Sequence, residues 1–194
     1  MAEYRRRSPL EHYAERLAEA SAPRIRVAEV PFLTHLTVRT DPKSAAFDRA
    51  GEVLGFGLPI APNTVTGDQR GWALWLGPDE WLVAAADRPG LEPALTAALK
   101  FGAVVDVSAQ RTTVELAGPA ARELLTKGCS VDLHPCAFGV GQCAQTTFAK
   151  APVILLPRSA DAYWVFVRAS FAEYFAEFVL DAMTEYQSGP GTGQ

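Results

Sequence analysis

The chain has 194 residues, of which 48% are hydrophobic and 21% are charged, so it is long enough for one globular domain or two small subdomains. Its net charge of −4 argues against a nucleic-acid-binding protein, and no run approaches the roughly 20 apolar residues of a membrane-spanning helix. The basic start lacks the apolar core of a secretion signal, which favours a cytoplasmic protein.

Residues 1–30 predict an N-terminal helix followed by an arm. Ser8 and Glu11 have the spacing of a capping box, and Pro9 suits the first helical position. The following stretch, residues 23–31, indicates a short strand or an extended arm.

Residues 31–108 predict an α+β subdomain. The expected elements are a strand, a helix, a loop, a two-stranded hairpin, a second helix and a last strand, at residues 34–40, 41–55, 56–71, 72–86, 88–102 and 103–108. This order is typical of the split ferredoxin-like plait.

The hairpin carries three tryptophans, Trp72, Trp75 and Trp81, and has large apolar side chains on both faces. A turn at residues 77–80 places Leu76 opposite Trp81 in the expected register. Helices cover only one face of a plait, so the other face needs cover from the second subdomain or from a partner chain. Both alternatives stay open, and the three tryptophans are therefore candidate interface residues.

Residues 109–186 predict a second α+β subdomain. Its expected elements are a strand, a helix, a loop, three strands and a closing helix, at residues 111–118, 119–128, 129–142, 143–150, 152–158, 163–169 and 170–186. The closing helix has an apolar stripe that indicates a core or docking face, formed by Phe171, Tyr174, Phe175, Phe178, Val179 and Ala182. Residues 187–194 are expected to form a disordered tail.

Three cysteines, Cys129, Cys136 and Cys143, lie in or beside the predicted loop together with His134. An odd number of cysteines argues against a disulfide framework, and the even spacing lacks the close pairs of zinc sites. We therefore expect partly buried thiols rather than a metal site, with their role left open.

A polar cluster between two apolar strands is the main candidate site. Asp106, Ser108, Gln110 and Arg111 lie within six residues of each other. The pattern fits a turn in which side chains bind the backbone, a site for a polar ligand, or an ion pair between subunits.

Four stretches around this cluster resemble a known family. They are LWLGPDEWLV at 74–83, VDVSAQRTTVELAGPAARELL at 105–125, KGCSVDLHP with FGVGQCAQTTFAKAPVILL between 127 and 156, and YWVFVRASFAEYF at 163–175. In this order they resemble the folate-binding aminomethyltransferase superfamily, and more closely the gamma subunit family of heterotetrameric sarcosine oxidase. The resemblance implies that the second subdomain is similar to the folate-binding domain of aminomethyltransferases.

The resemblance also implies an accessory role. Complexes of this family oxidatively demethylate sarcosine to glycine, pass a one-carbon unit to tetrahydrofolate and produce hydrogen peroxide. It implies alpha, beta and delta subunits as partners, and FAD, FMN, NAD, tetrahydrofolate and zinc bound by those subunits rather than by this chain.

One departure from the superfamily bears on catalysis. Aminomethyltransferases carry an essential carboxylate in the stretch that corresponds to residues 146–158, which contain no Asp or Glu here. We therefore expect no catalytic residue in this chain, and at most a vestigial folate site at Asp106, Ser108, Gln110 and Arg111. The alternatives are a stand-alone tetrahydrofolate-binding protein or aminomethyltransferase-like enzyme and, from KGC at 127–129, an iron–sulfur maturation factor.

Overall fold

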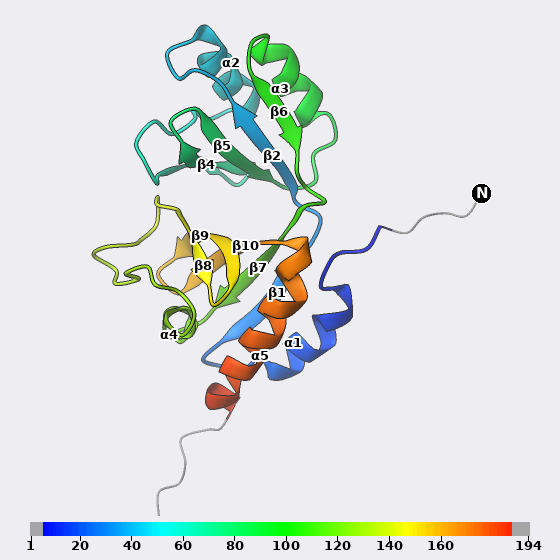
Figure 1. Ribbon diagram of the computed structural model, residues 1–194, viewed down its shortest axis with the longest axis vertical. Helices are drawn as coiled ribbons and strands as arrows, with labels where there is room; N and C mark the ends of the chain where they lie inside the picture. Colours follow the sequence, from blue (N-terminus) through cyan, green and yellow to red (C-terminus); the bar gives the residue numbers. More distant parts are fainter. Residues whose placement is uncertain (1–5, 188–194) are drawn as a thin grey trace, which may run out of the picture.

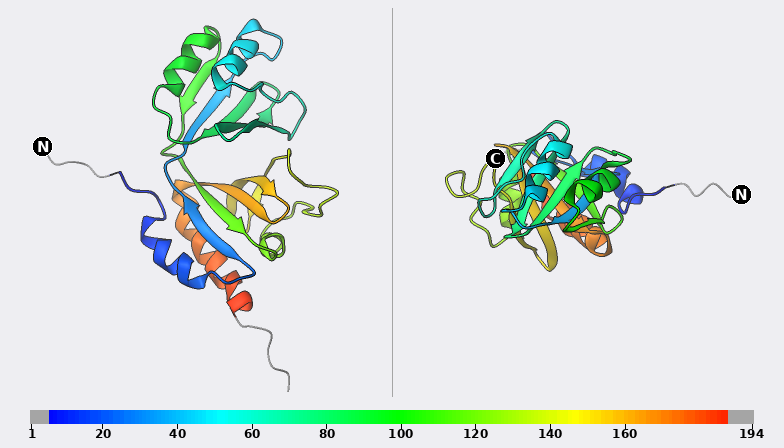
Figure 2. Two further views of the ribbon diagram at one scale, coloured as in Figure 1. Left: turned by 180° about the vertical axis from the view of Figure 1, so that it is seen from behind. Right: turned by 90° about the horizontal axis from the view of Figure 1, so that it is seen from above.

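The computed structural model describes residues 6–187, which form two five-stranded antiparallel sheets with helices. The two sheets lie one above the other along the long axis, each with its own helices (Figures 1 and 2). The chain crosses between them after β1 and again after β6, so the molecule is an α+β protein with two layered halves. Of the predicted tail at 187–194, residues 188–194 lie outside the described residues. Gln187 corrects the prediction because it is the last residue of α5.

The upper sheet has the strand order β3-β4-β5-β2-β6. Its elements are β2 (Thr34–Arg39), α2 (Ala45–Leu54), β3 (Val65–Asp68), β4 (Gly71–Gly77), β5 (Glu80–Ala85), α3 (Leu91–Leu99) and β6 (Ala103–Asp106). Without β3 the order β4-β5-β2-β6 is that of a ferredoxin-like plait, which confirms the predicted fold.

The prediction of a loop over residues 56–71 was wrong in part, because Val65–Asp68 form strand β3. It is only four residues long and pairs with β4 from Val65 opposite Leu74 to Asp68 opposite Gly71. Gly67 has a φ of 147°, and a Cβ there would collide with the Gly71 carbonyl oxygen, so this tight edge requires glycine. Glycine and aspartate are depleted in strands, which is why the sequence pattern favoured a loop.

The lower sheet has the strand order β1-β7-β10-β9-β8. Its elements are η1 (Glu11–Tyr13), α1 (Ala14–Ala20), β1 (Arg26–Val30), β7 (Arg111–Ala117), α4 (Ala121–Thr126), β8 (Ala144–Phe148), β9 (Ala151–Ser159), β10 (Ala162–Arg168), η2 (Ala169–Phe171) and α5 (Ala172–Gln187). The N-terminal arm supplies β1, which pairs with β7 at one edge of this sheet.

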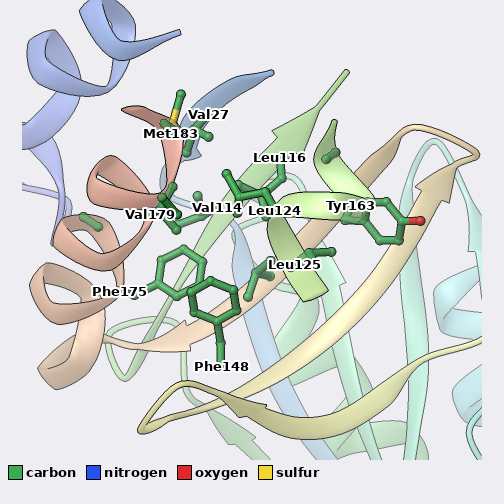
Figure 3. Packing of buried hydrophobic residues seen from close by; sticks show 14 of the residues in the cluster. Val27, Val114, Leu116, Leu124, Leu125, Phe148, Tyr163, Phe175, Val179 and Met183 are labelled. Carbon is green, nitrogen blue, oxygen red and sulfur yellow. The ribbon is translucent and has the colours of Figure 1, made fainter. Parts of the chain in front are cut away.

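The outer face of the lower sheet forms the largest core, against α1, α4 and α5 (Figure 3). Phe148 and Phe175 pack with ring centroids 4.9 Å apart in this cluster. The α5 stripe was predicted correctly at its buried members Phe175, Val179 and Ala182. Tyr174 is 39% exposed, so it is not part of the core.

The tryptophan hairpin is strands β4 and β5, and its register differs from the expected one. The turn pairs Gly77 with Glu80 as predicted, but the register shifts between Trp75 and Gly77, so Leu76 forms a bulge. Trp75 consequently lies opposite Trp81, not opposite Leu82. A one-residue shift moves a side chain to the other face of a sheet, so Trp81 joins the face that packs on α2 and α3.

The second face of the hairpin is covered by the chain itself. Leu74 and Leu82 pack in one cluster with side chains of the lower sheet, namely Ile154, Leu156, Trp164 and Phe166. The sequence left open whether the second subdomain or a partner chain covers this face, and in the structure the lower sheet of the same chain covers it. The cluster between the sheets also explains why a hairpin can be apolar on both faces.

Candidate functional site

A cavity of about 400 Å³ lies where the chain crosses between the two sheets. Its walls come from residues 6–9, from the β1–β2 link and the start of β2, and from the segment between the end of β6 and β7. Three of the four predicted polar residues, Asp106, Ser108 and Arg111, line it together. Gln110 is not part of the lining, and its carbonyl oxygen accepts a hydrogen bond from Ala169 N at 2.8 Å.

Asp106 and Ser108 form a turn that fixes the second crossing. The Ser108 backbone N–H donates to Asp106 Oδ1 at 2.8 Å, and hydrogen bonds from Ser108 lower the pKa of the Asp106 carboxyl. The Ser108 hydroxyl oxygen accepts from His35 N at 3.0 Å, which ties the crossing to β2. The backbone-binding turn is therefore one part of what this cluster does.

His35 is a cavity residue that the sequence did not single out. It is 1% exposed, its Nε2 lies 3.1 Å from Thr113 Oγ1, and its ring meets Phe166 edge-on at 5.6 Å. Nδ1 is buried and has no hydrogen-bond partner in the described residues. The available signal was the alternation in β2, which places position 35 on the face opposite Leu36 and Val38.

Burial, together with the nearby charge of Arg111, lowers the pKa of His35 to about 4, so the imidazole is neutral at pH 7. Arg111 itself lines the cavity half-buried, and its Nε is buried without a partner. Burial and the charge of Arg168 lower the pKa of the Arg111 guanidinium. The cavity thus combines a neutral imidazole with a poorly solvated guanidinium.

We predict that His35 makes folding sensitive to acid. A histidine whose folded pKa lies below its unfolded value of 6.5 contributes full stability above pH 6.5, and that contribution is lost as the pH falls toward 4. From pH 7 to about pH 4.5 the expected loss in unfolding free energy is about 2 kcal/mol. Urea denaturation of the wild type and His35→Gln across this range measures it.

Carboxylates with lowered pKa values, such as Asp106, also destabilise the fold in acid, but they are present in both proteins. The difference between the two pH profiles therefore isolates His35. Parallel profiles would contradict a buried, neutral imidazole.

The cysteines and His134 do not gather into a site. Cys136 is exposed, whereas burial raises the pKa of Cys129 to about 12 and that of Cys143 to about 11. His134 Nδ1 accepts a hydrogen bond from Cys136 N at 3.2 Å. Residues 6–187 contain no group of three His, Cys, Asp or Glu side chains placed to hold a metal ion.

The three tryptophans differ in their access to a partner. Trp81 is fully buried, and its Nε1 donates to Pro59 O at 2.7 Å, so it is not available as an interface residue. Trp72 and Trp75 are partly exposed and partly packed within the chain. Trp72 also contacts the guanidinium of Arg158, which lies 3.5 Å from its ring centroid and 4.1 Å from that of Trp164.

The stretch without acidic residues, 146–158, forms most of β8 and β9. Ile154 and Leu156 from this stretch pack against the hairpin in the cluster between the sheets. Where the superfamily resemblance implies a carboxylate, this chain therefore presents aliphatic side chains and Arg158.

The model of the family described as "Sarcosine oxidase, gamma subunit family" matches residues 39–185. A sarcosine oxidase subunit gamma of Corynebacterium sp. (strain P-1) is 43% identical over 189 residues, covering 95% of this chain and 93% of that protein. One of Arthrobacter sp is 44% identical over 187 residues, covering 94% and 92%.

Among solved structures, a chain of the heterotetrameric sarcosine oxidase from Corynebacterium sp. U-96, in complex with pyrrole 2-carboxylate, superposes with a TM-score of 0.90. It is 39% identical, with 95% of this chain and 97% of that chain covered. The glycine cleavage system aminomethyltransferase T of Bartonella henselae has a TM-score of 0.64 at 13% identity, covering 89% and 56%, and shares the fold alone. By sequence and structure, this chain belongs to the sarcosine oxidase gamma subunit family.

Proposed function

We propose that this chain is a non-catalytic structural subunit of a heterotetrameric sarcosine oxidase and assembles with alpha, beta and delta subunits. The observation that carries the proposal is the match over nearly the whole chain, combined with the lack of Asp and Glu in residues 146–158, where the superfamily resemblance implies a carboxylate. In this proposal the complex demethylates sarcosine to glycine, passes a one-carbon unit to tetrahydrofolate and forms hydrogen peroxide.

We assign the cofactors to the other subunits. The other subunits would bind FAD, FMN, NAD, tetrahydrofolate and zinc. This chain would provide contact surfaces for assembly and no catalytic residues. We place the complex in the cytoplasm as part of the same proposal. Within residues 6–187, no helix is long and apolar enough to span a membrane.

Co-expression tests this function. The four subunits are expressed together, and then without this chain. We expect purification of a tagged alpha subunit to recover this chain in equal amount, and its omission to lower the yield of assembled, active enzyme. Full activity and stability of the other three subunits without it would contradict the proposal. A stand-alone folate-binding role is not favoured, because the similar relatives are gamma subunits over the whole chain.

The exposed apolar side chains suggest which surfaces meet the partners. Phe101 is 88% exposed in the turn between α3 and β6, and Val105 on the edge strand β6 is 52% exposed. Ile60 and Val140 are exposed on two loops joined by a hydrogen bond from Cys143 N to Asn63 O. Together with the partly exposed Trp72 and Trp75, these are our interface candidates.

We predict that Phe101→Ser weakens assembly without unfolding the chain. An aromatic anchor at an interface typically contributes about 2 kcal/mol or more, which corresponds to at least roughly a 30-fold loss of affinity. Because Phe101 is exposed, the melting temperature of the isolated chain should hardly change. Affinity for the other three subunits is measured by biolayer interferometry, with the neighbouring exposed Lys100→Ser as control. Equal affinity of the two variants would remove Phe101 from the interface.

A further inference from the structure

Arg111 at the cavity between the sheets has no partner of its own. It is half-buried on β7, yet its side chain forms no hydrogen bond or ion pair with any residue of the described range 6–187, and its Nε is fully buried. Placing a guanidinium in such a position is unfavourable unless an acceptor binds it. The buried Nε of Arg111 therefore lacks an acceptor among residues 6–187.

His35 adds a second unsatisfied group to the same cavity. It lines the cavity, is 1% exposed, and has a buried Nδ1 without a partner. Thr113 Oγ1 lies 3.1 Å from Nε2. When the Thr113 hydroxyl donates to Nε2, the proton of the neutral ring is on Nδ1, which leaves a second unpaired donor.

The charged residues that line the cavity carry a net positive charge. Arg6 and Arg7 of the N-terminal segment line it with Arg111, against one carboxylate, Asp106. Arg6 is already paired with Asp87 at 3.0 Å and lies over the Phe32 ring at 4.6 Å, which holds the segment beside the cavity. Asp106 accepts the Ser108 backbone N–H at 2.8 Å, and Glu29 accepts the hydroxyls of Ser8 and Thr112 at the cavity wall. The charge of Glu80 acts on Arg111, but no carboxylate of residues 6–187 forms an ion pair with its guanidinium.

From these contacts we propose that the cavity binds a small organic anion through its carboxylate, with Arg111 as the charged partner and His35 as a second donor. A planar guanidinium edge matches a carboxylate better than a point charge does. The volume of about 400 Å³ is in the range of small-molecule sites, and all described walls belong to this chain. The proposal goes beyond the assembly function and does not depend on it.

Calorimetric titration of the purified full-length chain tests this site. Acetate, benzoate and inorganic phosphate are titrated at constant ionic strength into the wild type, Arg111→Met, Arg111→Lys and Arg39→Met. Arg39 is the matched control, since it is an exposed arginine at the other end of β2, paired with Asp79. We expect benzoate to bind, Arg111→Met to weaken binding at least about tenfold, Arg111→Lys to weaken it less, and Arg39→Met to bind as the wild type does.

A thermal scan separates a binding role from a structural one. Without ligand, Arg111→Met should melt at the wild-type temperature or above it, because it removes an unpaired, desolvated charge. With benzoate, the melting temperature of the wild type should rise and that of Arg111→Met should not. If Arg111→Met melts lower and carboxylate binding is unchanged, Arg111 is a structural residue and the proposal is wrong.

Three further results would overturn the proposal. The first is the absence of binding heat from acetate and benzoate at concentrations up to about 50 mM, because the dissociation constant would then be too high for a binding site. The second is tighter binding of phosphate than of benzoate, which would exclude a carboxylate site. The third is loss of benzoate binding in the purified complex of all four subunits, which would show that a partner group fills the cavity.

Discussion

We expect Trp81→Ala to lower the free energy of unfolding by about 4 kcal/mol, because it removes a large, fully buried side chain from the core of the upper sheet. The indole packs on Phe47 of α2 with ring centroids 5.4 Å apart, and its Nε1 donates to Pro59 O at 2.7 Å. The substitution loses packing and also leaves a buried carbonyl oxygen without its donor.

Urea denaturation followed by circular dichroism measures this loss, and Trp81→Phe separates its two causes. The phenylalanine keeps most of the packing but not the hydrogen bond, so it should cost roughly 1–3 kcal/mol. Trp75→Ala is the matched control on the same face of the hairpin, and its smaller burial predicts a smaller loss. If Trp81→Ala cost no more than Trp75→Ala, the bulged register of the hairpin would be wrong.

The plait could be predicted because its local signals agree. The helix at 41–55 has its stop at Gly55, which adopts a φ of 85°, and the alternation in β2 marks a strand. The same holds for α5, where Phe175 and Val179 recur at helical spacing and are buried. Sequence patterns predict an element correctly when neighbouring residues determine both its ends and its buried face.

The bulge and the cavity depend on residues far apart in the chain. No local pattern distinguishes a strand with Leu76 bulged from one without it, because the choice is made by packing Trp81 on α2. His35 and Thr113 are 78 residues apart and meet only because both crossings between the sheets run side by side. The sequence indicated Asp106, Ser108 and Arg111 as polar neighbours, but not that an unpaired imidazole lies beside them.

Phe166→Ala is expected to cost about 4 kcal/mol and to change the titration of His35. Phe166 of β10 is fully buried between the two sheets and contacts the His35 ring edge-on at 5.6 Å. Removing it opens the packing around the imidazole, so water can reach the ring and the burial that lowers its pKa to about 4 is reduced. The pKa of His35 should therefore rise toward 6.5, the unfolded value.

Nuclear magnetic resonance titration of the imidazole gives the pKa, and urea denaturation gives the stability. Phe171→Ala is the control, because Phe171 is only partly buried and belongs to η2, whose side chains pack with the other core of the lower sheet. It should cost less and leave the His35 titration unchanged. Since protonation of His35 is one cause of the lower stability in acid, Phe166→Ala should also narrow the stability difference between pH 7 and about pH 4.5. A lowered stability with an unchanged pKa would mean that Phe166 supports the sheets without shielding His35.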